Sequence, residues 1–278
     1  MENLKIMSHN VWGMFGANPV KRVDNRRDLM REIYLEQLPD VLGTQEFSIA
    51  MRESGLANDL LENGYCELNV SHDVEAYGMS NLFTPIFYRK DSCDVLNCGF
   101  FLFPRNFNNH DSKGVAWGIF RHKYTGAVFS VANTHFWYKG GEEHDLVRRD
   151  NAIMLLDVMK PLPKPWFIMG DLNCKTDSPA YKTLSGSGLS DAQLAAPDTI
   201  LGKAHHPYPE YDFEKQIFYG APVPMGDYTE SYDHIFVDSE HCSSVNRFVV
   251  LTDQNALDTS DHCPIFLEYQ VKSDVSSL

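Results

Sequence analysis

Six short polar segments of this sequence combine residues that can bind a metal ion or transfer a proton. The carboxylate and amide groups in them are oxygen ligands, which suit a hard divalent cation such as Mg²⁺ better than zinc. Two histidines, His135 and His262, can transfer protons near neutral pH. The segments are Ser8-His9-Asn10-Val11, Thr44-Gln45-Glu46, Asn133-Thr134-His135, Gly170-Asp171-Leu172-Asn173, Tyr232-Asp233-His234-Ile235-Phe236 and Thr259-Ser260-Asp261-His262.

Most of these segments lie at the ends of predicted β-strands, where loops held by rigid strands concentrate catalytic groups. Apolar patterning predicts strands and helices that alternate to the end of the sequence without a Gly/Ser linker, which indicates one domain over residues 1–272 and a frayed tail at 273–278. Residues 104–114 and 197–232 show no clear periodicity and read as loops. The predicted strands are 4–11, 41–46, 66–70, 82–89, 95–103, 115–121, 128–134, 166–171, 234–237, 248–251 and 265–271, and the helices are 24–38, 49–62 and 146–159.

Composition and charge restrict the classes of function. The 278 residues include 24 basic and 38 acidic side chains, a net charge of −14. Such a surface repels polyanions, so a protein that only coats nucleic acid is disfavoured unless metal ions supply positive charge. The amino-terminal residues do not resemble a secretory signal, no apolar run is long enough to span a membrane, and six scattered cysteines form no CxxC pair. We therefore expect a reduced, cytoplasmic protein.

Taken in order, the six segments resemble the endonuclease/exonuclease/phosphatase superfamily, the DNase I-like metal-dependent phosphoesterases. Each tripeptide alone is weakly specific, but the ordered set runs from residue 8 to residue 262. Residues 80–89 are also similar to uncharacterised bacterial members. The resemblance implies an α/β (α+β) fold, a four-layer αββα sandwich of two packed mixed β-sheets flanked by helices, with the site at one edge of the sheets.

The resemblance also implies the metal ligands. Glu46 corresponds to the principal ligand, with Asn10 and Asp261 as further ligands, and Asp171 is able to hold a second ion. We expect Mg²⁺, with Mn²⁺ or Ca²⁺ as alternatives, and the number of ions, one or two, stays open.

The catalytic roles follow from the same resemblance. Asp171 and Asn173 correspond to the pair that orients the attacking water, and His262 to the acid/base partner held by Asp233. His135 corresponds to the group that binds the phosphate oxygen, with Asn173 as a second substrate-binding residue. A cation opposite two histidine donors would stabilise the negative charge that develops during in-line displacement at phosphorus.

Each residue alone also has an ordinary structural explanation. Asn10, or Asp171 with Asn173, could form turns by local hydrogen bonding, and a single histidine is more often a structural residue. The predicted enzyme hydrolyses a phosphodiester or phosphomonoester, more readily a small soluble one than duplex DNA. The alternatives are a nuclease acting on DNA or RNA, a sphingomyelinase-like lipid phosphodiesterase, and a non-catalytic metal-binding module, against which an acid/base pair argues.

Other conspicuous residues receive structural interpretations. A basic cluster is predicted to be a solvated helix face paired with acidic residues at i,i+4 spacing, and two adjacent histidines are assigned to a loop. Two cysteines are expected to pack beneath the site, and the aromatic residues of 197–232 could equally pack on the fold or stack on substrate. These residues are Lys21, Arg22, Arg26, Arg27 and Arg31 with Asp24, Asp28 and Glu32; His205 and His206; Cys174 and Cys263; and Tyr208, Tyr211, Phe213, Phe218, Tyr219 and Tyr228.

Overall fold

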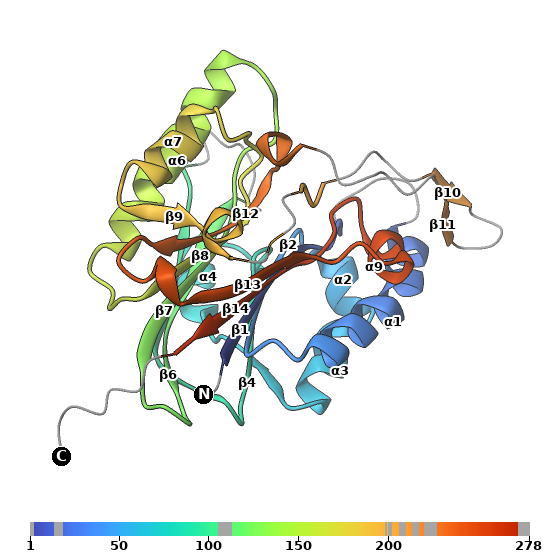
Figure 1. The fold of residues 1–278 in the computed structure, drawn as a ribbon. Helices are drawn as coiled ribbons and strands as arrows, with labels where there is room; N and C mark the ends of the chain where they lie inside the picture. The colour runs from blue at the N-terminus through green and yellow to red at the C-terminus, as the bar shows by residue number, and fades with distance from the viewer. Residues whose placement is uncertain are drawn as a thin grey trace.

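Two mixed β-sheets of six strands each pack face to face in the computed structural model (Figure 1). The structure describes residues 3–13, 19–104, 113–197, 199, 202–205, 210–212, 217–219 and 227–271. Sheet A has the order β13 (Val245–Val250), β14 (Ile265–Gln270), β1 (Asn3–Asn10), β2 (Val41–Gln45), β4 (Ile86–Arg89), β3 (Tyr65–Glu67). Sheet B has the order β5 (Cys93–Leu102), β6 (Gly114–His122), β7 (Val128–His135), β8 (Trp166–Asp171), β12 (Asp233–Asp238), β9 (Leu189–Asp191).

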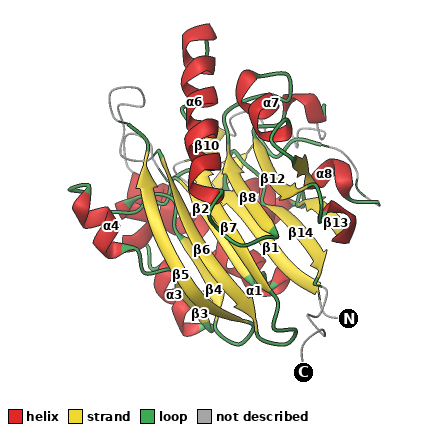
Figure 2. Cartoon of the chain, turned by 90° about the vertical axis from the view of Figure 1, so that its left-hand side faces the viewer, coloured by secondary structure: helices red, strands yellow, loops and turns green. Residues whose placement is uncertain are grey.

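Helices cover the outer faces of both sheets. In Figure 1 the helices beside sheet A are α1 (Pro19–Gln37), α2 (Ile49–Glu53), α3 (Leu56–Glu62) and α9 (Gln254–Thr259). Figure 2 shows α6 (Glu142–Met159) standing in front of sheet B, and α7 (Pro179–Ser185) packs against α6. Shorter helices, α4 (Ser71–Ala76) and α8 (Ala192–Ala195), lie at the sides of the sandwich. The predicted four-layer αββα sandwich is confirmed.

Three apolar layers follow from the two-residue alternation of side chains along the strands. On β1, Ile6 packs between the sheets, whereas its neighbour Met7 packs under the helices of sheet A. On β8, Met169 lies between the sheets and Ile168 packs under α6 and α7. All four side chains have an exposed fraction of 1% or less, so both faces of each central strand are buried.

Several predicted elements differ from the observed ones for local reasons. The helix predicted at 49–62 is two helices, because Gly55 between them has a left-handed φ of 92°. The strand predicted at 82–89 is confined to β4, and the segment after β3 forms α4. The predicted 197–232 loop contains a two-stranded hairpin, β10 (Glu210–Asp212) with β11 (Ile217–Tyr219). Residues 105–112 of the other predicted loop and the tail at 273–278 lie outside the described residues.

Candidate active site

One row of polar residues crosses sheet B where β7, β8 and β12 meet. The parallel register of β7 and β8 places His135 directly beside Asp171, and the antiparallel register of β8 and β12 places Asp171 beside Asp233. All three side chains are buried. Three segments that lie far apart in the sequence therefore deliver their acid/base groups to adjacent positions of one sheet.

Gly170 allows this row to form. Its φ is 148°, and a Cβ atom placed on it would lie 1.9 Å from the carbonyl oxygen of Thr134 on β7. A residue with a side chain cannot occupy this position without separating the two parallel strands. The glycine of the Gly-Asp-Leu-Asn segment thus brings β8 close enough to β7 for His135 and Asp171 to interact.

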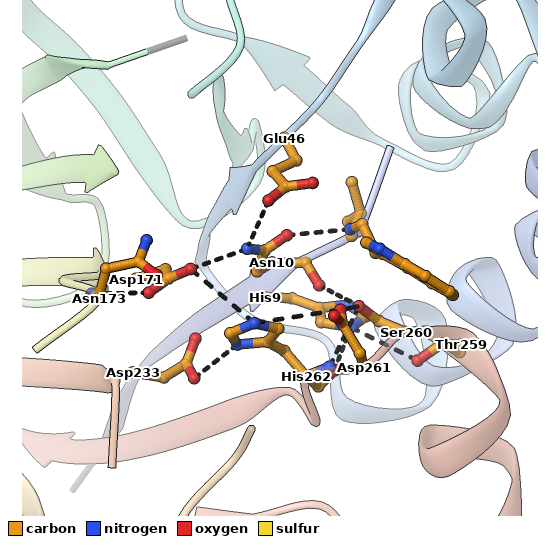
Figure 3. Close-up of polar contacts among 12 residues, drawn as sticks. His9, Asn10, Glu46, Asp171, Asn173, Asp233, Thr259, Ser260, Asp261 and His262 are labelled. Carbon is orange, nitrogen blue, oxygen red and sulfur yellow. Dashed lines mark hydrogen bonds and ion pairs between the residues drawn. The ribbon is translucent and has the colours of Figure 1, made fainter. Parts of the chain in front are cut away.

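Sheet A contributes the opposite side of the site. Asn10 ends β1 beside Gln45 of β2, and its Nδ2 donates to Oδ2 of Asp171 (2.9 Å) and to Oε1 of Glu46 (3.3 Å). Figure 3 shows Asn10 lying between these two carboxylates, one from each sheet. The Oδ1 atom of Asn10 accepts from the backbone N of Trp12 (2.9 Å). Asn10 therefore forms a local turn and joins the two halves of the site at the same time.

Asp171 and Asn173 likewise combine a turn with a place in the site. Oδ1 of Asp171 accepts from the backbone N of Asn173 (2.8 Å), while Oδ2 lies 3.4 Å from Nε2 of His135. Asn173 has a left-handed φ of 48°, and its Nδ2 donates to the carbonyl of Phe136 (3.2 Å). Burial raises the pKa of Asp171, but the neighbouring His262, His135 and Lys113 outweigh it and hold the pKa well below its usual range.

His262 and Asp233 form a buried hydrogen-bonded pair, with Nδ1 of His262 2.7 Å from Oδ2 of Asp233. The other ring nitrogen, Nε2, faces Oδ2 of Asp171 at 3.9 Å and Oδ1 of Asp261 at 4.0 Å (Figure 3). Burial lowers the pKa of His262, but Asp233, Asp261 and Asp171 outweigh it and raise the pKa well above its usual value. The imidazole is thus oriented by one carboxylate and presents Nε2 to two others.

Lys113 is a member of the site that the sequence analysis missed. Its side chain is buried, and Nζ lies 2.6 Å from Nε2 of His135. Burial lowers the pKa of Lys113 to about 8, although Glu46 and Asp171 act in the opposite direction. Burial and the adjacent Lys113 lower the pKa of His135, so a neutral His135 accepts from the ammonium group. One sequence signal was available: Lys113 directly precedes β6, whose start pairs with the end of β7.

His205 lies beside His262 at the site, although the sequence analysis assigned it to a loop as an ordinary residue. It forms an isolated β-bridge with His262, and the centroids of the two imidazole rings are 4.8 Å apart. One ligand atom each from His205, Asp261 and His262 lies within 4.8 Å of the others. Spacing along the chain could not reveal this arrangement, because residues 205 and 262 meet only in the folded protein. His206 lies outside the described residues.

A second buried histidine–carboxylate pair lies behind the row on β12. Nδ1 of His234 is 2.7 Å from Oδ2 of Asp191, and Nε2 is 3.1 Å from the carbonyl of Ser231. Tyr228 donates to the same oxygen of Asp191 (2.8 Å), so this aromatic residue of the predicted loop packs into the fold. Burial lowers the pKa of His234, but Asp191 and Asp233 outweigh it and raise the pKa. The network fixes residues 228–234, which carry Asp233.

Polar side chains also join the two sheets beneath the site. Asn133 of β7 donates to the carbonyls of Thr44 (2.8 Å) and Pro85 (2.9 Å), and Gln45 of β2 donates to Oδ1 of Asn133 (2.6 Å) and to Ser8 (3.0 Å). Opposite them, Gly43 leaves no room for a Cβ atom. Asn133 and Gln45 therefore hold the sheets together at this end, while His135 and Glu46 of the same segments reach the site.

A pocket of about 440 Å³ opens beside Asn173. Its wall combines aromatic residues, both signs of charge and backbone of the segment after β7. Arg148 stabilises that wall because its guanidinium group donates to the carbonyls of Trp137 (2.8 Å) and Lys139 (2.6 Å). The lining residues are Tyr138, Lys139, Gly140, Gly141, Asp145, Arg148, Asn173, Cys174, Lys175, Asp177, Ser178, Pro179 and Tyr232.

The basic cluster on α1 differs from its predicted solvated arrangement. Arg26 is buried, and its guanidinium group donates to the carbonyls of Val11, Trp12 and Thr259. Arg31 pairs with Asp28 at i,i+3 (3.2 Å), not at i,i+4. Arg26 thus ties α1 to the segments that carry Asn10 and Asp261. The side chains of Lys21, Arg22 and Asp24 lie outside the described part of the structure.

The remaining structural interpretations concern cysteines and aromatics. Cys174 and Cys263 are buried in apolar clusters, as expected. The side chains of Tyr208, Tyr211, Phe213, Phe218 and Tyr219 lie outside the described residues. None of the helices in the described part of the chain has the length and apolar character that a membrane crossing requires.

The donor groups of the site fit a hard divalent cation. The site gathers four carboxylates, and the positive charge that acts on them comes, among the residues described, from Lys113, His262, His234 and Arg26. Carboxylate oxygens are the ligands that Mg²⁺ prefers. The four carboxylates are those of Glu46, Asp171, Asp233 and Asp261.

The fold and this polar site define a sandwich protein of the DNase I-like class, and the sequence comparison agrees. The sequence profile of the endonuclease/exonuclease/phosphatase family matches residues 7–262, so the chain belongs to that family. None of the curated proteins matches the sequence.

Solved structures of similar fold include proteins with different activities. A family member from Bacteroides thetaiotaomicron is 24% identical, with 96% of this chain and 94% of that chain covered and a TM-score of 0.73. A mannosyl-6-phosphatase from the same organism is 22% identical, with 96% and 100% covered and a TM-score of 0.70. TDP2 from D. rerio, in complex with a single-stranded DNA product, is 16% identical, with 98% and 100% covered and a TM-score of 0.69.

Proposed function

We propose that the protein is a divalent-metal-dependent phosphoesterase that hydrolyses a small, polar phosphoester by in-line attack of water. The observation that carries the proposal is the meeting of Asp171, the His262–Asp233 pair and the Lys113–His135 pair at one end of the two sheets. Phosphoryl transfer requires positioning of water and stabilisation of charge on the phosphoryl oxygens, and this set of groups can supply both.

The metal is proposed to be Mg²⁺, with Mn²⁺ or Ca²⁺ as alternatives and one or two ions. Glu46, Asp261 and Asp171 would hold it, and Asn10 would orient Glu46 and Asp171 by the hydrogen bonds of its Nδ2. When bound, the ion would polarise a phosphoryl oxygen and balance the charge that develops there. The ligand role predicted for the oxygen of Asn10 stays a prediction.

The side chains divide the remaining work according to their ionisation. Asp171 is held in its anionic form and, with Asn173, would accept hydrogen bonds from the attacking water. His262 has a raised pKa and would act as the acid/base group that transfers a proton during hydrolysis. Asp233 would fix its tautomer. Lys113, whose ammonium group donates to His135, would donate to a phosphoryl oxygen on the other side of Asp171. The phosphate-binding role predicted for His135 itself stays a prediction.

Two observations favour a small substrate over duplex DNA. The pocket of about 440 Å³ beside Asn173 has a polar lining that suits a hydroxylated leaving group, such as a sugar. The net charge of −14 disfavours multiple contacts with nucleic acid phosphates. The fold similarity to a mannosyl-6-phosphatase supports the same substrate class. The nuclease alternative is favoured by the similarity to TDP2, whose structure holds a single-stranded DNA product.

We also propose that the protein works in a reducing compartment such as the cytoplasm. Its six cysteines are unpaired, and three of them, Cys93, Cys174 and Cys263, are buried. Thiols persist in this form where glutathione and thioredoxin keep them reduced.

A substrate panel with a matched pair of variants tests the proposed function. We expect p-nitrophenyl phosphate, bis-p-nitrophenyl phosphate or a hexose 6-phosphate to be hydrolysed with Mg²⁺ and not after chelation. Glu46→Gln keeps the shape of the side chain but removes its charge, and it should weaken Mg²⁺ binding in titration calorimetry. Glu75→Gln, on an exposed side chain of α4, should not. Cleavage of single-stranded DNA alone would favour the nuclease, and undiminished binding in Glu46→Gln would place the metal elsewhere.

A further inference from the structure

A second group of metal-ligating side chains lies beside the proposed Mg²⁺ ligands. His205, Asp261 and His262 each offer one ligand atom, and these atoms lie within 4.8 Å of one another. Asp261 and His262 are buried and His205 is half-buried. Glu46 is not part of this group. Two of the three ligands in the group are imidazoles.

The backbone holds His205 in this position. Residues 205 and 262 form a β-bridge, and the backbone N of Cys263 donates to the carbonyl of Ala204 (3.0 Å). Ala204 is itself buried, and the N of the nearby Gly202 donates to Oε1 of Gln193 (2.6 Å). The backbone of His205 is therefore held against the segment that carries His262.

The ligand chemistry differs from that of a Mg²⁺ site. Two imidazole nitrogens and one carboxylate oxygen, with a fourth position left to water, form a common set for Zn²⁺, whereas Mg²⁺ prefers oxygen ligands. Zinc-bound histidines usually donate their second ring N–H to a carboxylate. His262 already has that partner, because its Nδ1 is bonded to Asp233 while Nε2 faces Asp261.

We propose that His205, Asp261 and His262 form a binding site for a transition-metal ion such as Zn²⁺. Glu46, a proposed ligand of Mg²⁺, is not part of this site. An ion at this site occupies Nε2 of His262 and shares Asp261 with the Mg²⁺ site. Where the proposed phosphoesterase function holds, Zn²⁺ bound there inhibits hydrolysis by removing the proton-transfer group. The site thus makes the enzyme sensitive to free Zn²⁺.

Calorimetric titration of Zn²⁺ into the full chain, at saturating Mg²⁺, tests the proposal directly. We expect one Zn²⁺ per chain in the wild type and binding weakened by about tenfold or more in His205→Gln, since one of three protein ligands is lost. His241→Gln is the matched control, because His241 belongs to a separate cluster with Asp238 and the exposed Glu240. Its Zn²⁺ affinity should equal that of the wild type. Wild-type affinity in His205→Gln, or a loss confined to His241→Gln or Glu46→Gln, would overturn the proposal.

The kinetic measurement separates this site from the proposed function. Each variant is compared with its own Mg²⁺-dependent activity in the absence of Zn²⁺. On that basis His205→Gln should lose inhibition by micromolar Zn²⁺, whereas His241→Gln should remain inhibited. If no phosphoester is hydrolysed, the proposed function fails, and the calorimetric comparison of the two histidine variants still decides whether the zinc site exists. Inhibition of equal strength in both variants would contradict the assignment of the inhibitory ion to His205.

Discussion

At the scale of single residues, the two ring nitrogens of His262 have different partners. Asp233 fixes Nδ1 at 2.7 Å, and Nε2 faces the carboxylates of Asp171 and Asp261. If His262 transfers a proton during hydrolysis, His262→Ala should lower kcat by about 10²–10⁴-fold at saturating Mg²⁺. Asp233→Asn should also lower kcat, because an amide no longer fixes the imidazole tautomer.

The control for these variants is metal binding. Both should keep most of their Mg²⁺ affinity in calorimetry, since Glu46 is retained, and both should keep the wild-type circular dichroism spectrum. A near-wild-type kcat in either variant would show that the pair has a structural role only.

Lys113 should limit the activity of the protein at alkaline pH. Its pKa is lowered to about 8 by burial, so the ammonium form exists below that pH and is lost above it. A bound divalent cation would lower the pKa further. If the ammonium group holds a phosphoryl oxygen, kcat/KM should fall as the pH rises through about 8 or slightly below it.

Lys113→Arg distinguishes this ionisation from that of His262. Arginine stays protonated throughout the accessible range, so the alkaline limit should move to higher pH while His262 is unchanged. Lys113→Met should lose activity at every pH. An alkaline limit that stays in place in Lys113→Arg would assign it to another group.

At the scale of elements, the contact between β7 and β8 depends on Gly170. A Cβ at this position would lie 1.9 Å from the carbonyl oxygen of Thr134, and the φ of 148° is unfavourable for other residues. We expect Gly170→Ala to lower the free energy of unfolding by about 2 kcal/mol or more, measured by urea denaturation. Gly140→Ala is the control, because a Cβ placed there would meet nothing within 4 Å and no left-handed φ is involved. Equal stability of the two variants would contradict the close contact.

The elements also show which parts of the structure the sequence could reveal. Residues at strand ends, such as Asn10, Asp171 and Asp233, were found because alternating apolar runs end beside them and adjacent strands bring their ends together. The division of α2 from α3 depends on a single left-handed glycine inside a continuous apolar pattern, so periodicity alone could not show it. Asn133 and Gln45 were recognised as part of motifs, but their bonds between the sheets depend on how the sheets pack.

Lys113 and His205 were missed for a related reason. Each lies in a segment without apolar periodicity, and each acquires its role from a tertiary contact with a residue already assigned to the site. A lysine in a polar stretch is normally solvated, and only the structure shows that this one is buried. Arg26 was misassigned in the same way, since its charge satisfies backbone carbonyls of two distant segments.

At the scale of the whole molecule, the net charge of −14 makes salt dependence diagnostic of the substrate. With a small phosphoester, kcat/KM should fall only modestly between low and physiological salt, because few charges are neutralised in each encounter. A substrate that contacts the protein through several nucleic acid phosphates would instead give a steep linear fall of log affinity with log salt. Such a slope, measured with an oligonucleotide that is also cleaved, would contradict the preferred substrate class.

The position of β1 inside sheet A has a consequence for biosynthesis. This strand leaves the ribosome long before β14, which is one of its two neighbours and places Leu267 opposite Ile6. A nascent chain must therefore hold β1 with one edge unpaired until β14 has emerged, a non-local pairing of the kind that slows folding. Because Asp261 and His262 immediately precede β14, the closing of sheet A and the arrival of the last site residues are the same late event. If the proposed function holds, chains interrupted before that point lack Asp261 and His262 and would be inert, and activity would appear only as the sheet closes.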